Sequence, residues 1–121
     1  MKLILTVVML LIAVPVFAEQ TVENYIKYEN EYADDSAAKT IMETYVSALG
    51  SGMGWTNTIL NKRGQQELFC TPKNLALNYN NYIDIIDKQV DRVVQDGGGD
   101  DFPIPMLLLF GLMETFPCDK K

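Results

Sequence analysis

The side chains of this 121-residue chain that could do chemistry are two cysteines and sixteen acids, because the chain has no histidine. That absence removes the usual general base, the commonest zinc ligand and the middle member of nucleophilic triads. Two acids at a defined separation suffice for glycoside hydrolysis. Sixteen acids give some such pair by chance, however, and about 100 residues leave little room for a substrate cleft beside a core. We therefore do not expect an enzyme.

Two glycine-rich stretches invite ligand hypotheses that their spacing does not support. The stretch "QDGGGDD", residues 95–101, has acids and glycines but lacks the spacing of a calcium-binding EF-hand loop. The stretch "GSGMG", residues 50–54, follows no strand pattern and lacks the spacing of phosphate-binding loops. We expect neither a metal nor another cofactor.

The N-terminus has the pattern of a secretory signal peptide. Lys2 precedes an apolar run about 12 residues long, and Ala18 stands just before a switch to polar sequence at Glu19. The run is short against the roughly 20 residues of a spanning helix, so a retained anchor is the weaker alternative. We expect cleavage after Ala18, export of the mature chain, no membrane association afterwards and a single domain over residues 19–121.

In an exported chain, two cysteines more often form a disulfide than remain free thiols. We therefore expect a bond between Cys70 and Cys118. The formal charge of −6 becomes more negative when Lys2 is removed with the signal peptide. This acidity disfavours nucleic acid and anionic membranes as partners and favours a basic protein.

Apolar residues recur at helical spacing in four segments, and no strand alternation is strong enough to predict a sheet. We expect helices over residues 21–32, from the capping cluster Asp34-Asp35-Ser36 onward, around residues 79–93 and over residues 106–116. The last segment is apolar round most of its circumference, so we expect other helices or a second subunit to enclose it. The predicted fold is all-α, a small bundle of about four helices with one disulfide.

The second helix is the longest, and three glycines lie within it, each costing about 1 kcal/mol relative to alanine. Either the helix breaks there, or small residues let another helix approach closely. Trp55 beside the glycines is expected to be a core or interface anchor. The face predicted to be apolar or small comprises Ile41, Tyr45, Ala48, Leu49, Gly52, Met53, Thr56, Ile59 and Leu60.

The third helix is amphipathic, and the loop after it is rich in glycine and acid. A solvated acidic face and an ordinary flexible connection are the simplest interpretations of these two features. A docking surface for a cationic partner is the functional alternative. The apolar face comprises Tyr79, Tyr82, Ile83, Ile86, Val90 and Val93. The candidate partner-binding residues are Asp84, Asp87 and Asp91 on the helix, and Asp96, Asp100, Asp101 and Phe102 in the loop.

Behind the signal peptide, the segments "YVSALGSGMGWTN", "LFCTPKNL", "YNNYIDIIDKQVD" and "PMLLLFGLMETFPC" occur in that order. This arrangement resembles the Rap/Tai family of periplasmic immunity proteins over roughly residues 37–118. Its more specific parts are the C-x-P element at Cys70 and Pro72 and the ending G-L-x-x-x-F-P-C, from Gly111 to Cys118. The segment "IMETYVSALG" lacks the cysteine that family members often have there.

The resemblance implies an all-helical, often dimeric protein without catalytic activity. Such a protein would bind a cell-wall amidase delivered by the type VI secretion system of a sister cell, and would cover its cysteine-histidine active site. A periplasmic helical chaperone or stress protein is the alternative function, since such proteins are also small, helical and held by one disulfide.

Overall fold

The computed structural model describes residues 19–119 and confirms the all-α prediction. Its helices are α2 (Val22–Glu31), α3 (Ser36–Lys62), α4 (Tyr79–Gln95) and α5 (Ile104–Thr115). The predicted signal peptide, residues 1–18, lies outside the described residues. Within residues 19–119, none of the helices has the length and apolar character needed to cross a membrane.

Polar side chains cap α2, α3 and α4. The Thr21 hydroxyl accepts from the backbone N–H of Asn24, and the Asp35 carboxylate accepts from that of Ala38 at 2.8 Å. Asn78 and Asn81 form a reciprocal capping box at the start of α4. The capping cluster predicted at residues 34–36 therefore does start α3, with Asp35 as the capping residue.

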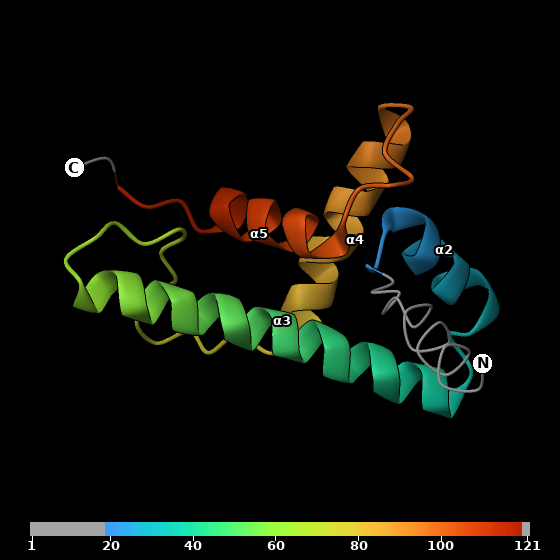
Figure 1. The fold of residues 1–121 in the computed structure, drawn as a ribbon, viewed down its shortest axis with the longest axis horizontal. Coiled ribbons are helices and arrows are strands. Elements are labelled where there is room, and N and C mark those ends of the chain that lie inside the picture. The colour runs from blue at the N-terminus through green and yellow to red at the C-terminus, as the bar shows by residue number, and fades with distance from the viewer. Residues whose placement is uncertain (1–18, 120–121) are drawn as a thin grey trace, which may run out of the picture.

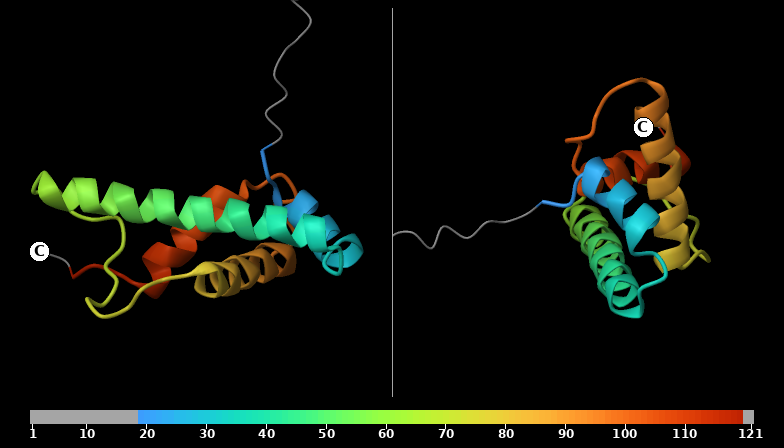
Figure 2. Two further views of the ribbon diagram at one scale, coloured as in Figure 1. Left: turned by 90° about the horizontal axis from the view of Figure 1, so that it is seen from below. Right: turned by 90° about the vertical axis from the view of Figure 1, so that its right-hand side faces the viewer.

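The four helices enclose one core. In Figure 1, α4 crosses behind α3 and α5 at a steep angle, and Figure 2 shows α2 between α3 and α4. The most deeply buried side chains come from all four helices: Val22, Tyr25, Val46, Ile86, Ile104, Leu108 and Leu112. One backbone bridge pairs Thr21 with Pro103, so the start of α2 is also tied to the start of α5.

The long helix α3 continues through its glycines, which settles the choice between a break and a close approach. Gly50 is buried, and a Cβ built there would overlap the ring of Tyr82 on α4. At Gly52 and Gly54, by contrast, a Cβ would meet nothing within 4 Å. Close packing therefore accounts for one of the three glycines.

The prediction of the apolar face of α3 was wrong in its orientation. The buried residues are Met42, Val46, Gly50 and Asn57, whereas Ile41, Ala48, Gly52, Thr56 and Ile59 of the predicted face are exposed. Trp55 is 68% exposed and is not a core residue. The rotation follows from the position of Gly50, because the side of the helix that admits Tyr82 is the side that packs on α4.

Helices α4 and α5 pack as predicted in part. The buried residues of α4 are Tyr82, Ile85, Ile86, Gln89 and Val90, so its core face includes Ile85 and Gln89 besides the predicted positions. A Cβ at Gly111 would overlap the side chain of Ile85, so the missing side chain lets α5 approach α4 closely.

The last helix begins earlier than predicted, and the other described helices enclose it only in part. It begins at Ile104, with Pro105 in its first turn, where proline needs no N–H partner. Residues 19–119 leave part of its surface uncovered, because Phe110 is 50% and Met113 41% exposed. Part of its outer surface is therefore open.

Candidate binding surface

The acidic face predicted on α4 borders a hollow shared with α2. The hollow has a volume of about 370 Å³ and is lined by Tyr25, Ile26, Glu29, Asp87, Val90 and Asp91. Asp84, Asp87 and Asp91 are all exposed, as predicted, but Asp84 is not among the lining residues. The site thus has an apolar floor and a rim of carboxylates, one of which, Glu29, was not among the predicted site residues.

The Tyr25 side chain fixes the position of one of these carboxylates. Tyr25 is only 2% exposed, and its hydroxyl donates a hydrogen bond to Asp87. Burial, together with the bond to Asp87 and its charge, raises the pKa of Tyr25 well above its ordinary value. The phenol therefore remains a donor, and Asp87 has a structural role in joining α2 to α4 as well as an exposed edge.

The pKa of Glu29 is raised partly because another carboxylate lies nearby at this rim. Burial and, secondly, the charge of Asp87 raise the pKa of Glu29 above its ordinary value. A cation placed in the hollow would relieve this repulsion, because an opposite charge nearby favours the ionised carboxyl. The hollow therefore suits a lysine or arginine side chain of a partner.

The glycine loop between α4 and α5 is anchored along its second half. The backbone N–H of Val22 donates to the carbonyl of Phe102 at 3.0 Å, and that of Glu23 donates to the carbonyl of Asp100 at 2.9 Å. The N–H of Ile104 donates in turn to the carbonyl of Gln20 at 2.8 Å. The loop is thus more constrained than an ordinary flexible connection, although its acids remain exposed.

Within this loop, glycine is required at the position that Phe102 covers. Gly99 has φ +93°, and a Cβ there would meet the Phe102 ring and the side chain of Val93. Phe102 itself is 38% exposed, and Asp96, Asp100 and Asp101 are exposed. The loop residues predicted from the sequence therefore present four accessible side chains.

Helix α2 connects the two groups of predicted site residues. Tyr25 bonds to Asp87 on α4, while the N–H of Glu23 bonds to the loop at Asp100. The sequence did not predict this connection, because it depends on the tertiary position of a short helix. The only sequence signal for it was the small amphipathic pattern of residues 21–32.

A second hollow, which the sequence did not reveal, lies between α2 and α3. This groove has a volume of about 570 Å³ and is lined by Gln20, Asn24, Lys27, Tyr28, Tyr32, Ala38, Ile41, Met42 and Tyr45. Three tyrosines and one lysine give it a different character from the acidic hollow. Aromatic side chains of this kind are enriched at the centres of protein interfaces.

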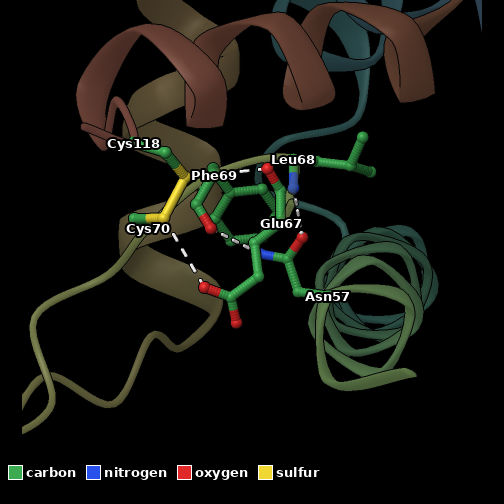
Figure 3. The surroundings of a disulfide bond; sticks show 6 residues. All are labelled: Asn57, Glu67, Leu68, Phe69, Cys70 and Cys118. Atoms are coloured by element: carbon green, nitrogen blue, oxygen red, sulfur yellow. Dashed lines mark hydrogen bonds between the residues drawn. A yellow bond between two sulfur atoms is a disulfide. The ribbon is translucent and has the colours of Figure 1, made fainter. Parts of the chain in front are cut away.

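The opposite end of the molecule is held by the disulfide. Cys70 and Cys118 are bonded, as predicted, and the Cys70 N–H donates to the carbonyl of Phe116 at 2.7 Å. Figure 3 shows Asn57 of α3 bonded to the loop beside the disulfide: its amide donates to the carbonyl of Phe69 at 2.6 Å and accepts from the N–H of Leu68 at 2.8 Å. These bonds fix the long connection between α3 and α4.

The acidic hollow offers hydrogen-bond acceptors and negative charge. Among the described residues, no group of three or more histidine, cysteine or acidic side chains is arranged to hold a metal ion. Both cysteines are in the disulfide, and the acidic hollow offers carboxylate acceptors and one phenol donor already in use. Such a surface can accept hydrogen bonds and positive charge from a partner.

No family model, curated protein or solved structure matches this chain.

Proposed function

We propose that this protein is a periplasmic immunity protein that binds and blocks a peptidoglycan amidase delivered by type VI secretion. The resemblance of its segment order and its G-L-x-x-x-F-P-C ending to the Rap/Tai family motivates the proposal. The mature chain would act without catalysis, by covering the active site of the toxin. Its partner would be the cognate amidase effector.

The observation that carries the proposal is the acidic hollow between α2 and α4, in which a hydrogen bond fixes the position of one carboxylate. Tyr25 bonds Asp87 in place, so this carboxylate is ordered before a partner arrives. A surface ordered in advance loses less conformational entropy on binding, which favours the tight association an inhibitor needs. The rim acids attract a cationic partner and the floor accepts the apolar stem of its lysine or arginine.

A lasting inhibitor also needs more contact than one hollow provides. Standard interfaces bury about 1,600 Å² in total and have a few anchors near their centre. The anchored loop, with exposed Asp100, Asp101 and Phe102, extends the surface from the hollow past the start of α2. In this proposal the loop residues enter the cleft of the amidase and the hollow receives a basic side chain from its edge.

Co-expression of the full chain with periplasm-directed amidases encoded beside its gene tests this function. We expect relief of lysis and co-purification of the mature chain with one of these enzymes. If no amidase forms a complex and no lysis is relieved, the immunity function fails for those toxins.

Charge reversal then tests the surface. The double variant Asp84→Lys/Asp91→Lys should weaken amidase binding by at least about tenfold, because it replaces attraction by repulsion at the rim of the hollow, where Asp91 lies, and on the exposed face of α4 beside it, where Asp84 lies. Asp100→Lys and Asp101→Lys test the loop in the same way. Asp119→Lys, beside the disulfide, is the matched control and should leave binding unchanged. Unchanged affinity in all the surface variants would place the docking site elsewhere.

A chaperone of the periplasm is the second candidate, and the exposed apolar side chains Phe110 and Met113 favour it. An acid-activated chaperone of this size should lose its dimer and expose apolar surface at low pH. Circular dichroism and light scattering through an acid titration distinguish the two functions. A dimer that stays folded and intact at about pH 3 would count against the chaperone.

A further inference from the structure

Between Ile41 and Ile59, the outward face of α3 has no charged residue, and the other described helices leave most of it exposed. Ile41 is 70%, Trp55 68% and Ile59 48% exposed. In Figure 2 (left), α4 lies below α3 and α5 crosses behind it, so neither helix covers the near side of α3. An uncharged face about 27 Å long, at 1.5 Å per residue from Ile41 to Ile59, is unexpected on a chain with this many acids.

We name this face the α3 outer face. Its residue types are nearly the same whether they are read from its N-terminal end or from its C-terminal end toward the middle, which is level with Gly50. At 100° per residue its members fall within an arc of about 120°. They are Ile41, Thr44, Tyr45, Ala48, Gly52, Trp55, Thr56 and Ile59. Read from the two ends inward, the pairs are Ile with Ile, Thr with Thr, Tyr with Trp and Ala with Gly.

The two threonines share a further property that suits an apolar contact. The Thr44 hydroxyl donates to the carbonyl of Thr40 at 2.8 Å, and the Thr56 hydroxyl donates to that of Gly52 at 2.9 Å. Each hydroxyl proton is therefore used within the helix. Burial of these side chains against another surface would leave no donor without a partner.

We infer that the α3 outer face binds a second copy of this chain, with the two α3 helices antiparallel across a twofold axis level with Gly50. In a twofold interface the same surface patch of both copies is in contact, and residue i of one copy meets residue j of the other while j meets i. The patch must therefore be complementary to itself when it is turned round by 180°. In this register each residue n is level with residue 100 − n of the other copy. Ala48 and Gly52 then meet at the centre, where small residues allow the helices to approach closely.

The distribution of charge fits a second copy in this orientation. Removal of Lys2 with the signal peptide brings the formal charge from −6 to −7, so two copies repel each other wherever their acids meet. The α3 outer face brings no acids together. At its ends, the acidic start of one α3, Asp34 and Asp35, lies near the basic end of the other, Lys62 and Arg63.

The groove between α2 and α3 supplies a complementary shape for the same arrangement. Ile41 and Tyr45 belong both to the α3 outer face and to the lining of this groove. In the antiparallel register, Ile59 of the second copy is level with Ile41 and Trp55 of the second copy is level with Tyr45. Large exposed side chains of one copy therefore come to the edge of a hollow on the other.

Sedimentation velocity of the mature chain over a range of concentrations tests the association. We expect a dimer that Trp55→Glu weakens by about 30-fold or more, as for a central aromatic anchor of an interface. Phe110→Glu, which also places a charge on an exposed apolar position, is the matched control and should leave the dimer intact. A monomer at all concentrations would overturn the inference, as would a dimer that Phe110→Glu disrupts and Trp55→Glu does not.

Two double variants test the antiparallel register. Ile41→Glu/Ile59→Glu puts like charges opposite each other, whereas Ile41→Lys/Ile59→Glu puts lysine opposite glutamate at both ends. The lysine–glutamate variant should dimerise about tenfold or more tightly than the glutamate–glutamate variant. Equal weakening in both, as a parallel pairing would give, contradicts this register. Circular dichroism of each variant checks that the helices remain folded, and none of these results depends on the identity of the toxin.

Discussion

At the scale of the residue, Gly50 and Gly54 are one turn apart on α3 and have opposite effects. A Cβ at Gly50 would overlap the ring of Tyr82, so the missing side chain permits the contact between α3 and α4. A Cβ at Gly54 would meet nothing within 4 Å, so that glycine only weakens the helix. The residue type is the same, and the neighbouring helix decides its role.

Alanine substitutions at the two glycines should therefore change stability in opposite directions. Gly50→Ala forces the Tyr82 ring out of its position and should lower the free energy of unfolding by about 1–3 kcal/mol. Gly54→Ala should raise it by about 1 kcal/mol through better helix propensity. Urea denaturation of the mature chain measures both. A Gly50→Ala variant as stable as Gly54→Ala would contradict the packing of α3 on α4.

The raised pKa of Glu29 predicts how stability depends on pH. Because the folded state holds the proton more tightly than the unfolded state, ionised Glu29 opposes folding above its folded-state pKa, and this cost disappears below the unfolded-state value. Glu29→Gln should therefore raise Tm near pH 7 and change it little near pH 3. Glu31→Gln at the exposed end of α2 is the control, and an equal gain from it would indicate a general effect of net charge.

At the scale of the element, the connection between α3 and α4 holds its shape without helical structure of its own. Asn57 from α3 supplies both a donor and an acceptor to its backbone, at Phe69 and Leu68. Phe69 is buried in the core, and the adjacent Cys70 joins this connection to the end of α5. The Asn57 side chain and the disulfide thus hold a connection that has no helical hydrogen bonds of its own.

Loss of the Asn57 side chain should destabilise the protein well beyond an ordinary surface change. Asn57→Ala leaves the N–H of Leu68 and the carbonyl of Phe69 without their partner, which should cost about 2–3 kcal/mol. Asn61→Ala, one turn later at an exposed position, should stay within about 0.5 kcal/mol. Denaturation midpoints compare the two variants, and a similar small change in both would refute the role of Asn57.

The disulfide should contribute more than any single hydrogen bond. Its cysteines are 48 residues apart, and the chain-entropy relation gives about 4 kcal/mol for closing a loop of this length. The double variant Cys70→Ser/Cys118→Ser should lose that amount in urea denaturation, and addition of a reductant should then have no further effect. A double variant as stable as the wild type would show that the bond does not support the fold.

The elements could be predicted from the sequence more readily than their orientation. Four helical segments and the capping residue Asp35 follow from local patterns, which involve few neighbours. The buried side of α3 does not, because apolar residues lie on both its inner and outer faces, as Met42 and Ile41 illustrate. Only the contact of Gly50 with Tyr82, from a distant part of the sequence, decides between the two faces.

The candidate site was predictable to a similar degree. Periodicity placed Asp84, Asp87 and Asp91 on one exposed face, since charge at helical spacing is a local signal. The bond from Tyr25 to Asp87 and the contribution of Glu29 could not be predicted, because Tyr25 and Asp87 are 62 residues apart in the chain. The anchoring of the loop to the start of α2 was missed for the same reason.

At the scale of the whole molecule, α2 separates two surfaces of different character. Tyr25, Ile26 and Glu29 contribute to the acidic hollow beside α4, whereas Asn24, Lys27 and Tyr28 contribute to the tyrosine-lined groove beside α3. Pairing of two copies through the α3 outer face would therefore leave the acidic hollow of each copy open. In the proposed function, each subunit of the dimer could bind its own toxin molecule.

The most direct test of the proposed function is a titration of peptidoglycan hydrolysis by a cell-wall amidase that co-purifies with the mature chain. We expect the purified mature chain to abolish hydrolysis at about one subunit per enzyme, because occlusion by a tight complex is stoichiometric. The variant Asp84→Lys/Asp91→Lys should require a clear excess. Full amidase activity in the presence of a large excess of the folded wild-type protein would contradict the account.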